Sequence, residues 1–428
     1  MNPLKPGRRP EDGLRLLHVS NRITPLGGAE RTMELHREVL RDAGHQVFIA
    51  SGEEAAPDYE PHAHLLPARM GLRDALDGGR RIADLARHHD VDLIHVYNMV
   101  DFLGPRSLAI MNRCRPTVRT LFDVRPTCIR ETRVHPRDGR PCEIRQGISC
   151  LRAPCFERTP RARGKWLLRR WVDNLLGLRS SRSLPLNIVY SDYMRDLLRA
   201  HGFGDDRVRV LTHHVDVPGA PAPGPPLPSS EPRTVVAAGR LDESKGVVQL
   251  VQVAALLRDH EIRFELFGDG PFRSQMEEDV ARLGLGDRVQ VHGRASDEEL
   301  GQALRRAGMV VVAPRVLETL SRIGIEGNLA GRPVVAYGGG GLSQWLVHDV
   351  NGLLVEFGDP KALAAAILQL ANDPARATQL GQEGWKRMKA HFTRERQAED
   401  LQAAYRDAIR SWPRGAGGAR PDPVPARE

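Results

Sequence analysis

The chain has 428 residues, a length that favours two domains of about 200 residues each over a single core. It carries 62 Lys and Arg against 54 Asp and Glu, a formal net charge of +8. Residues 1–20 contain no apolar signal region, and no run approaches the roughly 18 apolar residues of a membrane span, so we expect a soluble cytoplasmic protein.

The positive charge is concentrated in one part of the chain. Residues 113–182 hold 18 Lys and Arg against 6 Asp and Glu, so this segment has a net charge of +12 and the rest of the chain −4. Such a surface attracts nucleic acid, anionic lipid headgroups or a phosphorylated substrate. The alternative is a solvated arginine-rich face without a partner.

The first half alternates short apolar runs with stretches of helical periodicity. The runs begin at residues 14, 45, 92, 117, 186 and 208. Strands that alternate with helices predict a parallel sheet, so residues 14–215 are expected to form one Rossmann-like α/β domain. Proline and glycine in the segment 216–232 exclude a helix or a central strand there and predict an extended linker.

The same alternation begins again after the linker. Its apolar runs start at residues 234, 264, 289, 309, 333 and 352. Residues 233–395 are therefore predicted to form a second α/β domain, followed by a helix at 396–411 and a disordered tail at 412–428. Ligands bind beyond the carboxyl ends of the strands in open parallel sheets, so two such sheets facing each other predict a site between them.

Candidate binding residues follow the first strand of each half. Gly27 and Gly28 lie between an apolar run and a helix, where glycine lets a ligand approach backbone amides, although an ordinary turn is the alternative. Arg240 and Lys245 follow the strand at 234, and two cations at a strand end suit a diphosphate. The alternative is an exposed loop whose cations pair with neighbouring carboxylates.

Two glycines and two glutamates follow later strands of the second half. Gly268 and Gly270 allow another close approach of backbone to ligand. Glu318 and Glu326 are eight positions apart, about 12 Å along a continuous helix, which is too far for a paired-acid hydrolase. We therefore place Glu318 in a loop and Glu326 on the following helix, with amides near Ser321 for phosphate oxygens. A nucleoside diphosphate sugar carries its groups in this order.

Five motifs occur in a specific order: GGAER, GRLDESKG, FGDGPF, the glutamate pair followed by AGRPVVAYGGGG, and NGLLVEFGDP. Together they resemble the retaining GT-B glycosyltransferases of family four over about residues 14–395. The resemblance implies two facing Rossmann-like domains, C-terminal helices that cross back to the first, and a nucleotide-sugar donor held mainly by the second. It also implies retention of anomeric configuration and no catalytic metal. A UDP-sugar is favoured as donor, with a GDP-sugar as the alternative.

Residue roles follow from the resemblance. Arg240 and Lys245 correspond to the pair that neutralises the donor diphosphate and stabilises it as a leaving group. Glu326 corresponds to the residue that holds the ribose, and Glu318 to the one that holds hydroxyls of the transferred sugar, while Gly28 lines the site from the first domain. The predicted donor-binding set also includes Gly27, Gly268, Gly270, Leu320 and Ser321.

Three positions depart from the family pattern. Residues 319–321 read Thr-Leu-Ser where many relatives have Gly-Phe-Gly, so side chains occupy positions that usually leave amides bare. Phe122 precedes Asp123 where related enzymes often have a histidine, so Asp123 or a substrate phosphate is expected to assist catalysis. Gln344 stands where an acidic residue is common. An impaired or unusually specific transferase is the alternative.

Four of the five cysteines fall in a predicted insert of the first domain at about 124–182, namely Cys128, Cys142, Cys150 and Cys155. Four thiolates suit a structural zinc ion, with His135 as a substitute ligand. Reduced free thiols are the alternative, because disulfides are disfavoured in the cytoplasm. Some glycosyltransferases of this type carry a similar insert, which implies that it shapes the acceptor side.

The insert ends in a basic segment, 161–182, with apolar residues near helical spacing. They are Trp166, Leu167, Trp171, Leu175 and Leu178. Such a helix either lies on the anionic inner face of a membrane or packs this stripe on the core of the first domain.

The leading prediction is a retaining glycosyltransferase of polysaccharide or cell-envelope biosynthesis, acting on a saccharide, lipid-linked or small-molecule acceptor. A nucleotide-binding scaffold without catalysis is the main alternative, since the histidine is missing. A metal-stapled nucleic-acid-binding protein is disfavoured because the segment 113–160 has only two aromatic residues for stacking. A nicotinamide-dependent oxidoreductase is disfavoured by the absence of a GxGxxG motif. The sequence does not predict an oligomeric state.

Overall fold

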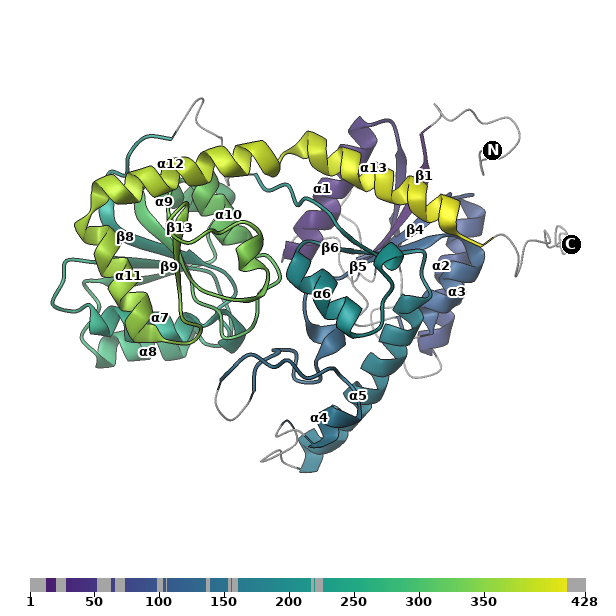
Figure 1. The fold of residues 1–428 in the computed structure, drawn as a ribbon, viewed down its shortest axis with the longest axis horizontal. Helices are drawn as coiled ribbons and strands as arrows, with labels where there is room; N and C mark the ends of the chain where they lie inside the picture. The colour runs from purple at the N-terminus through teal and green to yellow at the C-terminus, as the bar shows by residue number, and fades with distance from the viewer. Residues whose placement is uncertain are drawn as a thin grey trace, which may run out of the picture.

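The computed structural model describes the chain in several stretches. They are residues 13–20, 28–51, 63–65, 74–97, 103–104, 106–135, 139–152, 155, 161–216, 219 and 226–413. These residues form two α/β halves, each built on a parallel sheet, and long C-terminal helices run over both of them (Figure 1). The predicted fold class, with two Rossmann-like sheets, is confirmed.

The sheet of the first half has seven parallel strands in the order β3-β2-β1-β4-β5-β6-β7. They are β1 (Arg15–Ser20), β2 (Gln46–Ser51), β3 (Ala63–Leu65), β4 (Leu93–Val96), β5 (Thr117–Thr120), β6 (Leu186–Val189) and β7 (Val208–Val210). All except β3 coincide with apolar runs of the sequence. The side chains of β4 are buried on both faces of the sheet, as expected for a central parallel strand covered by helices.

Helices occupy the connections between these strands. They are α1 (Gly28–Asp42), α2 (Asp74–His88), α3 (Ser107–Cys114), α4 (Ile148–Arg152), α5 (Arg161–Arg182) and α6 (Asp192–Ala200), with single turns η2 (Arg125–Thr127) and η4 (Asp205–Arg207). The sequence explains α6 locally, because the Ser191 hydroxyl accepts a hydrogen bond from the Met194 amide and Leu197 and Leu198 are buried beneath it. The insert between β5 and β6 contains η2, α4 and α5.

The sheet of the second half has six parallel strands in the order β10-β9-β8-β11-β12-β13. They are β8 (Glu231–Ala238), β9 (Arg263–Phe267), β10 (Val289–Gly293), β11 (Ala307–Val312), β12 (Val334–Tyr337) and β13 (Gly352–Val355). Each coincides with a predicted apolar run. The connecting elements are η5 (Glu243–Lys245), α7 (Val247–Leu256), α8 (Arg273–Arg282), α9 (Asp297–Arg306), α10 (Arg322–Leu329), η6 (Gly340–Gln344) and α11 (Pro360–Asn372).

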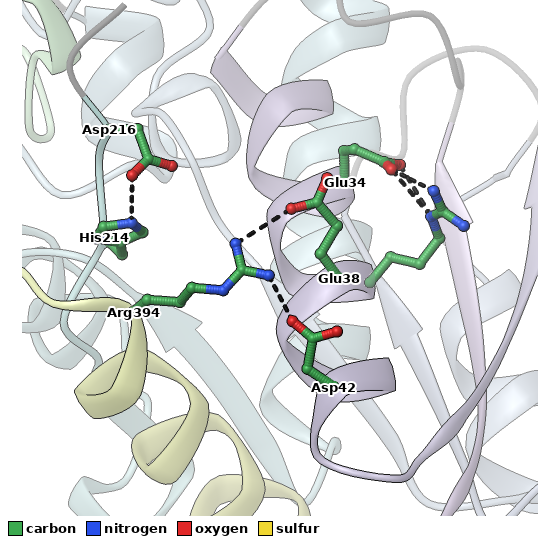
Figure 2. A network of polar contacts seen from close by, with 7 residues as sticks. Glu34, Glu38, Asp42, His214, Asp216 and Arg394 are labelled. Atoms are coloured by element: carbon green, nitrogen blue, oxygen red, sulfur yellow. Dashed lines mark hydrogen bonds and ion pairs between the residues drawn. The ribbon is translucent and has the colours of Figure 1, made fainter. Parts of the chain in front are cut away.

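The two halves are joined by α12 (Pro374–His391) and α13 (Arg394–Ser411). Figure 1 shows α12 beside the second half and α13 lying across the first, so the chain crosses back. Arg394, at the start of α13, pairs with Glu38 at 3.3 Å and with Asp42 at 2.7 Å, both on α1 (Figure 2). At the other end of α13, the Trp412 indole N–H donates to the Asn112 carbonyl oxygen at 2.7 Å.

One buried apolar cluster contains side chains of both sheets and of α13. Leu16 of β1 and Val118 of β5 belong to it, as do Val310 of β11, Ile325 of α10 and Tyr405 of α13. The junction between the halves is therefore part of the core, and residues placed at it are held by packing from both sides.

Two predicted segments extend beyond the described residues. In the linker, residues 217–218 and 220–225 lie outside them, and β8 begins at Glu231, inside the predicted limit of 232. In the tail, residues 414–428 lie outside the described part, whereas Trp412 is anchored to the first half. Within the described stretches, no helix is both long enough and apolar enough to cross a bilayer.

Candidate functional site

The segments that follow β8 and β11 carry most of the charged residues predicted for the site. Lys245, in the turn after β8, donates from Nζ to the Glu318 carboxylate at 2.5 Å, and Glu318 lies in the loop after β11. A cation predicted to meet phosphate and a carboxylate predicted to meet sugar are thus direct neighbours. The pair is only partly exposed, which strengthens it relative to a surface ion pair.

Arg240 has a different environment from Lys245. Its side chain is 70% exposed and pairs with Asp242, whose carboxylate also accepts a hydrogen bond from the Ser244 hydroxyl at 2.5 Å. Burial raises the pKa of Asp242, but the hydrogen bonds from Ser244 and Arg240 outweigh burial and hold that pKa below its ordinary value. Asp242 is therefore an anion at neutral pH that keeps Arg240 beside the loop.

Gly268 and Gly270 have a structural reason that the sequence analysis did not anticipate. A Cβ atom at Gly268 would overlap the carbonyl oxygen of Gly239, and one at Gly270 would overlap that of Leu241. The loop after β9 packs directly on the loop after β8. Glycine is therefore required here because the backbones of the two loops approach each other closely, and not because a ligand does. Both positions support the segment that carries Arg240.

The helix α10 begins at the same sheet edge and follows an unusual residue. Ser321, at its N-cap, has a φ of +68° and makes no side-chain capping hydrogen bond. A positive φ is costly for any residue except glycine. The first amides of a helix have no partner within it, so this end of α10 can bind an anion. Leu320 is buried, and its carbonyl oxygen accepts a hydrogen bond from Trp345 Nε1 at 2.5 Å.

Glu326 is buried on α10 and is paired. Arg322 donates from Nη2 to the Glu326 carboxylate at 3.1 Å, one helical turn away. Burial raises the pKa of Glu326 and the Arg322 guanidinium opposes that shift, so the net pKa lies above the ordinary value. A Cβ atom added to Gly28 would lie 3.6 Å from Arg322 Cδ, which places Arg322 between Glu326 and the first half. Gly27 lies outside the described residues.

The sequence analysis missed Arg322. No acidic residue accompanies it in the first turn of α10, where the helix dipole disfavours a cation. A cation at the wrong end of a helix was the available signal, because such an exception to local preference often marks a functional position.

Several hydrogen bonds connect the loops of the second half to the first. The Thr319 hydroxyl donates to the Phe122 carbonyl oxygen at 2.5 Å, and the Leu317 amide donates to that of Thr132 at 3.4 Å. The Gln344 side chain accepts from the Asp192 amide at 3.1 Å. All three departures from the family pattern therefore take part in contacts between the halves, Thr319 and Gln344 through their side chains and Phe122 through its carbonyl oxygen.

Asp123 faces a cation of its own half. Its carboxylate accepts a hydrogen bond from Arg125 Nε at 2.6 Å and another from the Arg125 amide at 2.9 Å. The adjacent Phe122 ring stacks on Tyr97 with ring centroids 6.3 Å apart. Asp123 is therefore held at the start of the insert, beside the backbone that Thr319 contacts.

The four cysteines of the insert are close to one another in the fold. Burial first, and then the neighbouring thiols of Cys128, Cys142 and Cys150, raise the pKa of Cys155 to about 11. The Arg133 amide donates to Cys128 Sγ at 3.4 Å. Among the described residues, however, no three His, Cys, Asp or Glu side chains are arranged to hold a metal ion. The zinc site, with or without His135, therefore stays a prediction.

Solved structures of other proteins share this architecture. The sucrose-phosphate synthase of Thermosynechococcus elongatus aligns with a TM-score of 0.70 and 21% identity over 93% of this chain and 100% of that one. HepE of Anabaena, solved in complex with UDP-glucose, aligns with a TM-score of 0.67 and 18% identity over 91% of this chain and 100% of HepE. The fold is therefore the GT-B arrangement.

Sequence comparison gives the family. Residues 26–218 match the model of Glycosyltransferase Family 4, and residues 224–387 match that of Glycosyl transferases group 1. The chain belongs to these group 1 and family 4 glycosyltransferases. LpsD of Rhizobium meliloti, a lipopolysaccharide core biosynthesis glycosyltransferase, is 32% identical over 177 residues, which is 40% of this chain and 50% of LpsD. The chain spans half or less of the length of the curated relatives that it matches.

Proposed function

We propose that the protein transfers a sugar from a nucleoside diphosphate sugar to a hydroxyl group of its acceptor, with retention of anomeric configuration. The observation that carries the proposal is the ion pair of Lys245 with Glu318, next to the amides that begin α10. These groups suit the diphosphate and the sugar of one ligand, and they lie where the two halves meet.

The diphosphate would take the cations. Lys245 and the exposed Arg240 would neutralise its oxygens, together with the first amides of α10. When the bond from the anomeric carbon to the phosphate oxygen breaks, that bonding pair leaves with the diphosphate. Fixed cations stabilise this charge more in the transition state than in the ground state, which accelerates the reaction.

The two glutamates would hold the neutral parts of the donor. Once Lys245 turns to phosphate, the Glu318 carboxylate is released to accept hydrogen bonds from sugar hydroxyls. Glu326 would accept hydrogen bonds from the ribose, and its pairing with Arg322 offsets the burial that would otherwise protonate it more readily.

The acceptor would approach from the side of the insert. Its hydroxyl would attack the anomeric carbon on the face that the diphosphate leaves and would lose its proton to the departing phosphate oxygen. Phe122 has no proton-accepting side chain, and Asp123 is engaged by Arg125, so the leaving phosphate is the base that this arrangement favours. The step then needs no protein nucleophile and no metal.

The comparisons support particular substrate classes. HepE was solved with UDP-glucose, which favours a UDP-sugar donor over the GDP-sugar alternative. LpsD is described as a lipopolysaccharide core enzyme, whereas other relatives are described as glucosyltransferases of 2-deoxystreptamine or glycosyltransferases of D-inositol 3-phosphate, so relatives support both saccharide and small-molecule acceptors.

The donor assignment is tested by thermal unfolding with UDP, GDP, ADP and TDP and their sugars. A ligand at 100 times its Kd should add about 2.7 kcal/mol to the unfolding free energy. We expect one nucleotide to stabilise the wild type and to lose most of that effect in Lys245→Ala and Glu326→Gln. Lys386→Ala, an exposed lysine on α12, is the matched control and should respond like the wild type. A folded protein that responds to no nucleotide would refute the proposal.

A second function is a nucleotide-binding scaffold without catalysis. The observation that favours it is the engagement of Asp123 by Arg125, beside a phenylalanine in place of the usual histidine. Such a scaffold would be stabilised against thermal unfolding by one nucleotide. It would release no nucleoside diphosphate from any donor, even when extracts that supply acceptors are present.

A further inference from the structure

The helix α5 carries an exposed apolar line that faces away from the protein. Leu168, Val172 and Leu176 are 50%, 42% and 39% exposed. They are spaced four residues apart, so they follow one another along a single face of the helix. A helix of 22 residues extends about 33 Å, and this line occupies its middle.

The opposite face of α5 attaches the helix to its domain. Leu167 and Leu178 are buried, and Trp171 Nε1 donates to the Gly147 carbonyl oxygen at 3.0 Å. Asn174 donates from Nδ2 to the Arg125 carbonyl oxygen at 2.8 Å. Leu167, Trp171 and Leu178 of the apolar stripe predicted from the sequence therefore face the protein, in agreement with the alternative in which the stripe packs on the domain. The exposed line of Leu168, Val172 and Leu176 is a separate feature.

The neighbouring helix α4 carries one more exposed apolar side chain. Ile148, its first residue, is 67% exposed. Of the seven large apolar side chains that are exposed in the described part of the chain, four lie between residues 148 and 176. Figure 1 shows α4 and α5 together at an edge of the molecule, on the far side of the first half from α13. A concentration of this kind marks an interaction surface.

Positive charges lie on the same face of α5. Lys165, Arg169 and Arg179 are exposed; at about 100° per residue, Lys165 and Arg179 fall within the arc that contains the apolar line, and Arg169 lies about 20° beyond it. Asp173 is the acidic residue of the helix and lies 3.7 Å from Arg169. The surface is thus aliphatic at its centre and cationic beside it.

We propose that α5 lies on an anionic phospholipid bilayer. Aliphatic side chains enter the interfacial region while arginine and lysine remain with the headgroups, so both parts of this face are satisfied at once. A nucleic acid would leave Leu168, Val172 and Leu176 in water, because aliphatic side chains offer no ring on which bases could stack. The exposed aliphatic line with cations beside it therefore favours an anionic bilayer as the partner.

The orientation has a consequence for the acceptor, which rests on the proposed function. Through Asn174, α5 contacts the turn that follows Asp123 at the junction of the halves. A bilayer under α5 would place the acceptor side close to the headgroups, as a lipid-linked acceptor requires.

The test uses the full chain and sedimentation with vesicles. Vesicles of phosphatidylcholine alone are compared with vesicles that also contain phosphatidylglycerol. We expect binding to the anionic vesicles only, weakened by salt. The triple variant Leu168→Ser, Val172→Ser, Leu176→Ser should bind at least about tenfold more weakly, since three apolar contacts are lost. The matched control is Leu256→Ser, which changes an exposed leucine at the end of α7.

Three results would overturn the proposal. One is a wild type that does not bind anionic vesicles, and another is a triple variant that binds as well as the wild type. The third is a wild type that forms dimers without vesicle binding and becomes monomeric in the triple variant, which would assign the face to a second copy of the chain. The thermal stabilisation by nucleotide should be the same in the triple variant and the wild type. Failure of the vesicle-binding proposal can therefore be distinguished from failure of the proposed donor site.

Discussion

A cluster of buried histidines makes the stability of the protein sensitive to acid. His18, His36, His95 and His213 are all fully buried where α13 covers the first sheet. Most of their ring nitrogens have hydroxyl or amide partners, including Tyr97 with His36 at 2.8 Å and Tyr405 with His95 at 2.7 Å, whereas His18 Nδ1 is buried without a hydrogen-bond partner among the described residues. Burial lowers the pKa of each of the four below its ordinary value.

The size of the effect follows from His36, whose pKa is lowered to about 3 by burial. In the unfolded chain a histidine has a pKa of about 6.5, so below that pH the unfolded state binds a proton that the folded state does not. The unfolding free energy is therefore at its full value above about pH 6.5. It decreases as the pH falls from there to the pKa of His36 in the folded state. Between pH 7 and pH 5, His36 alone should lower the unfolding free energy by about 2 kcal/mol. The other three act in the same direction.

Urea unfolding at a series of pH values between 7 and 5 measures this dependence. We expect the unfolding free energy of His36→Gln to fall less steeply with pH than that of the wild type, by about 2 kcal/mol over the range. His391→Gln, which alters an exposed histidine at the end of α12, is the control and should keep the wild-type slope. Equal slopes for the wild type and His36→Gln would refute the reasoning.

Three further changes have definite outcomes. Ser321→Gly should raise the unfolding free energy of the ligand-free protein by roughly 1 kcal/mol in calorimetry, because glycine adopts the φ of +68° without strain; an unchanged or lower value would show that the backbone is not strained there. Lys245→Ala should lower kcat for sugar transfer by about 100-fold or more with an intact fold, since it removes a cation at the leaving group, and a change confined to KM would assign Lys245 to donor binding alone. Metal analysis of purified protein should find about one zinc per chain in the wild type and none in Cys150→Ser; a zinc-free wild type with four titratable thiols in the insert would establish the free-thiol alternative.

Most of the fold was predictable because the strands are short, apolar and regularly spaced. Twelve predicted runs became strands, since a parallel strand covered on both faces needs continuous apolar residues. The thirteenth strand, β3, was missed because Ala63–Leu65 is too short to show a pattern. It is defined by pairing with β2, which is a tertiary contact.

The site was predictable in part. The spacing of Glu318 and Glu326 correctly predicted a loop position and a helix position. The sequence does not reveal the ion pairs of Lys245 and Arg322. Each cation has many acidic residues along the chain as possible partners, and only the fold determines which one it contacts. The exposed line on α5 was missed for a related reason. Apolar residues occur around much of that helix, and only the packing of the insert decides which of them face solvent.

The contact of α13 with the first sheet also affects how the protein is made. His95 and its partner Tyr405 are separated by 310 residues, so at roughly 5 to 20 residues per second the ribosome needs on the order of 15 to 60 s to supply the second after the first. During that interval the polar cluster of the first half has no covering helix. We expect the nascent first half to remain incompletely folded and to depend on chaperones until α13 emerges, so that a ribosome stalled before residue 394 would carry a chain that is readily degraded.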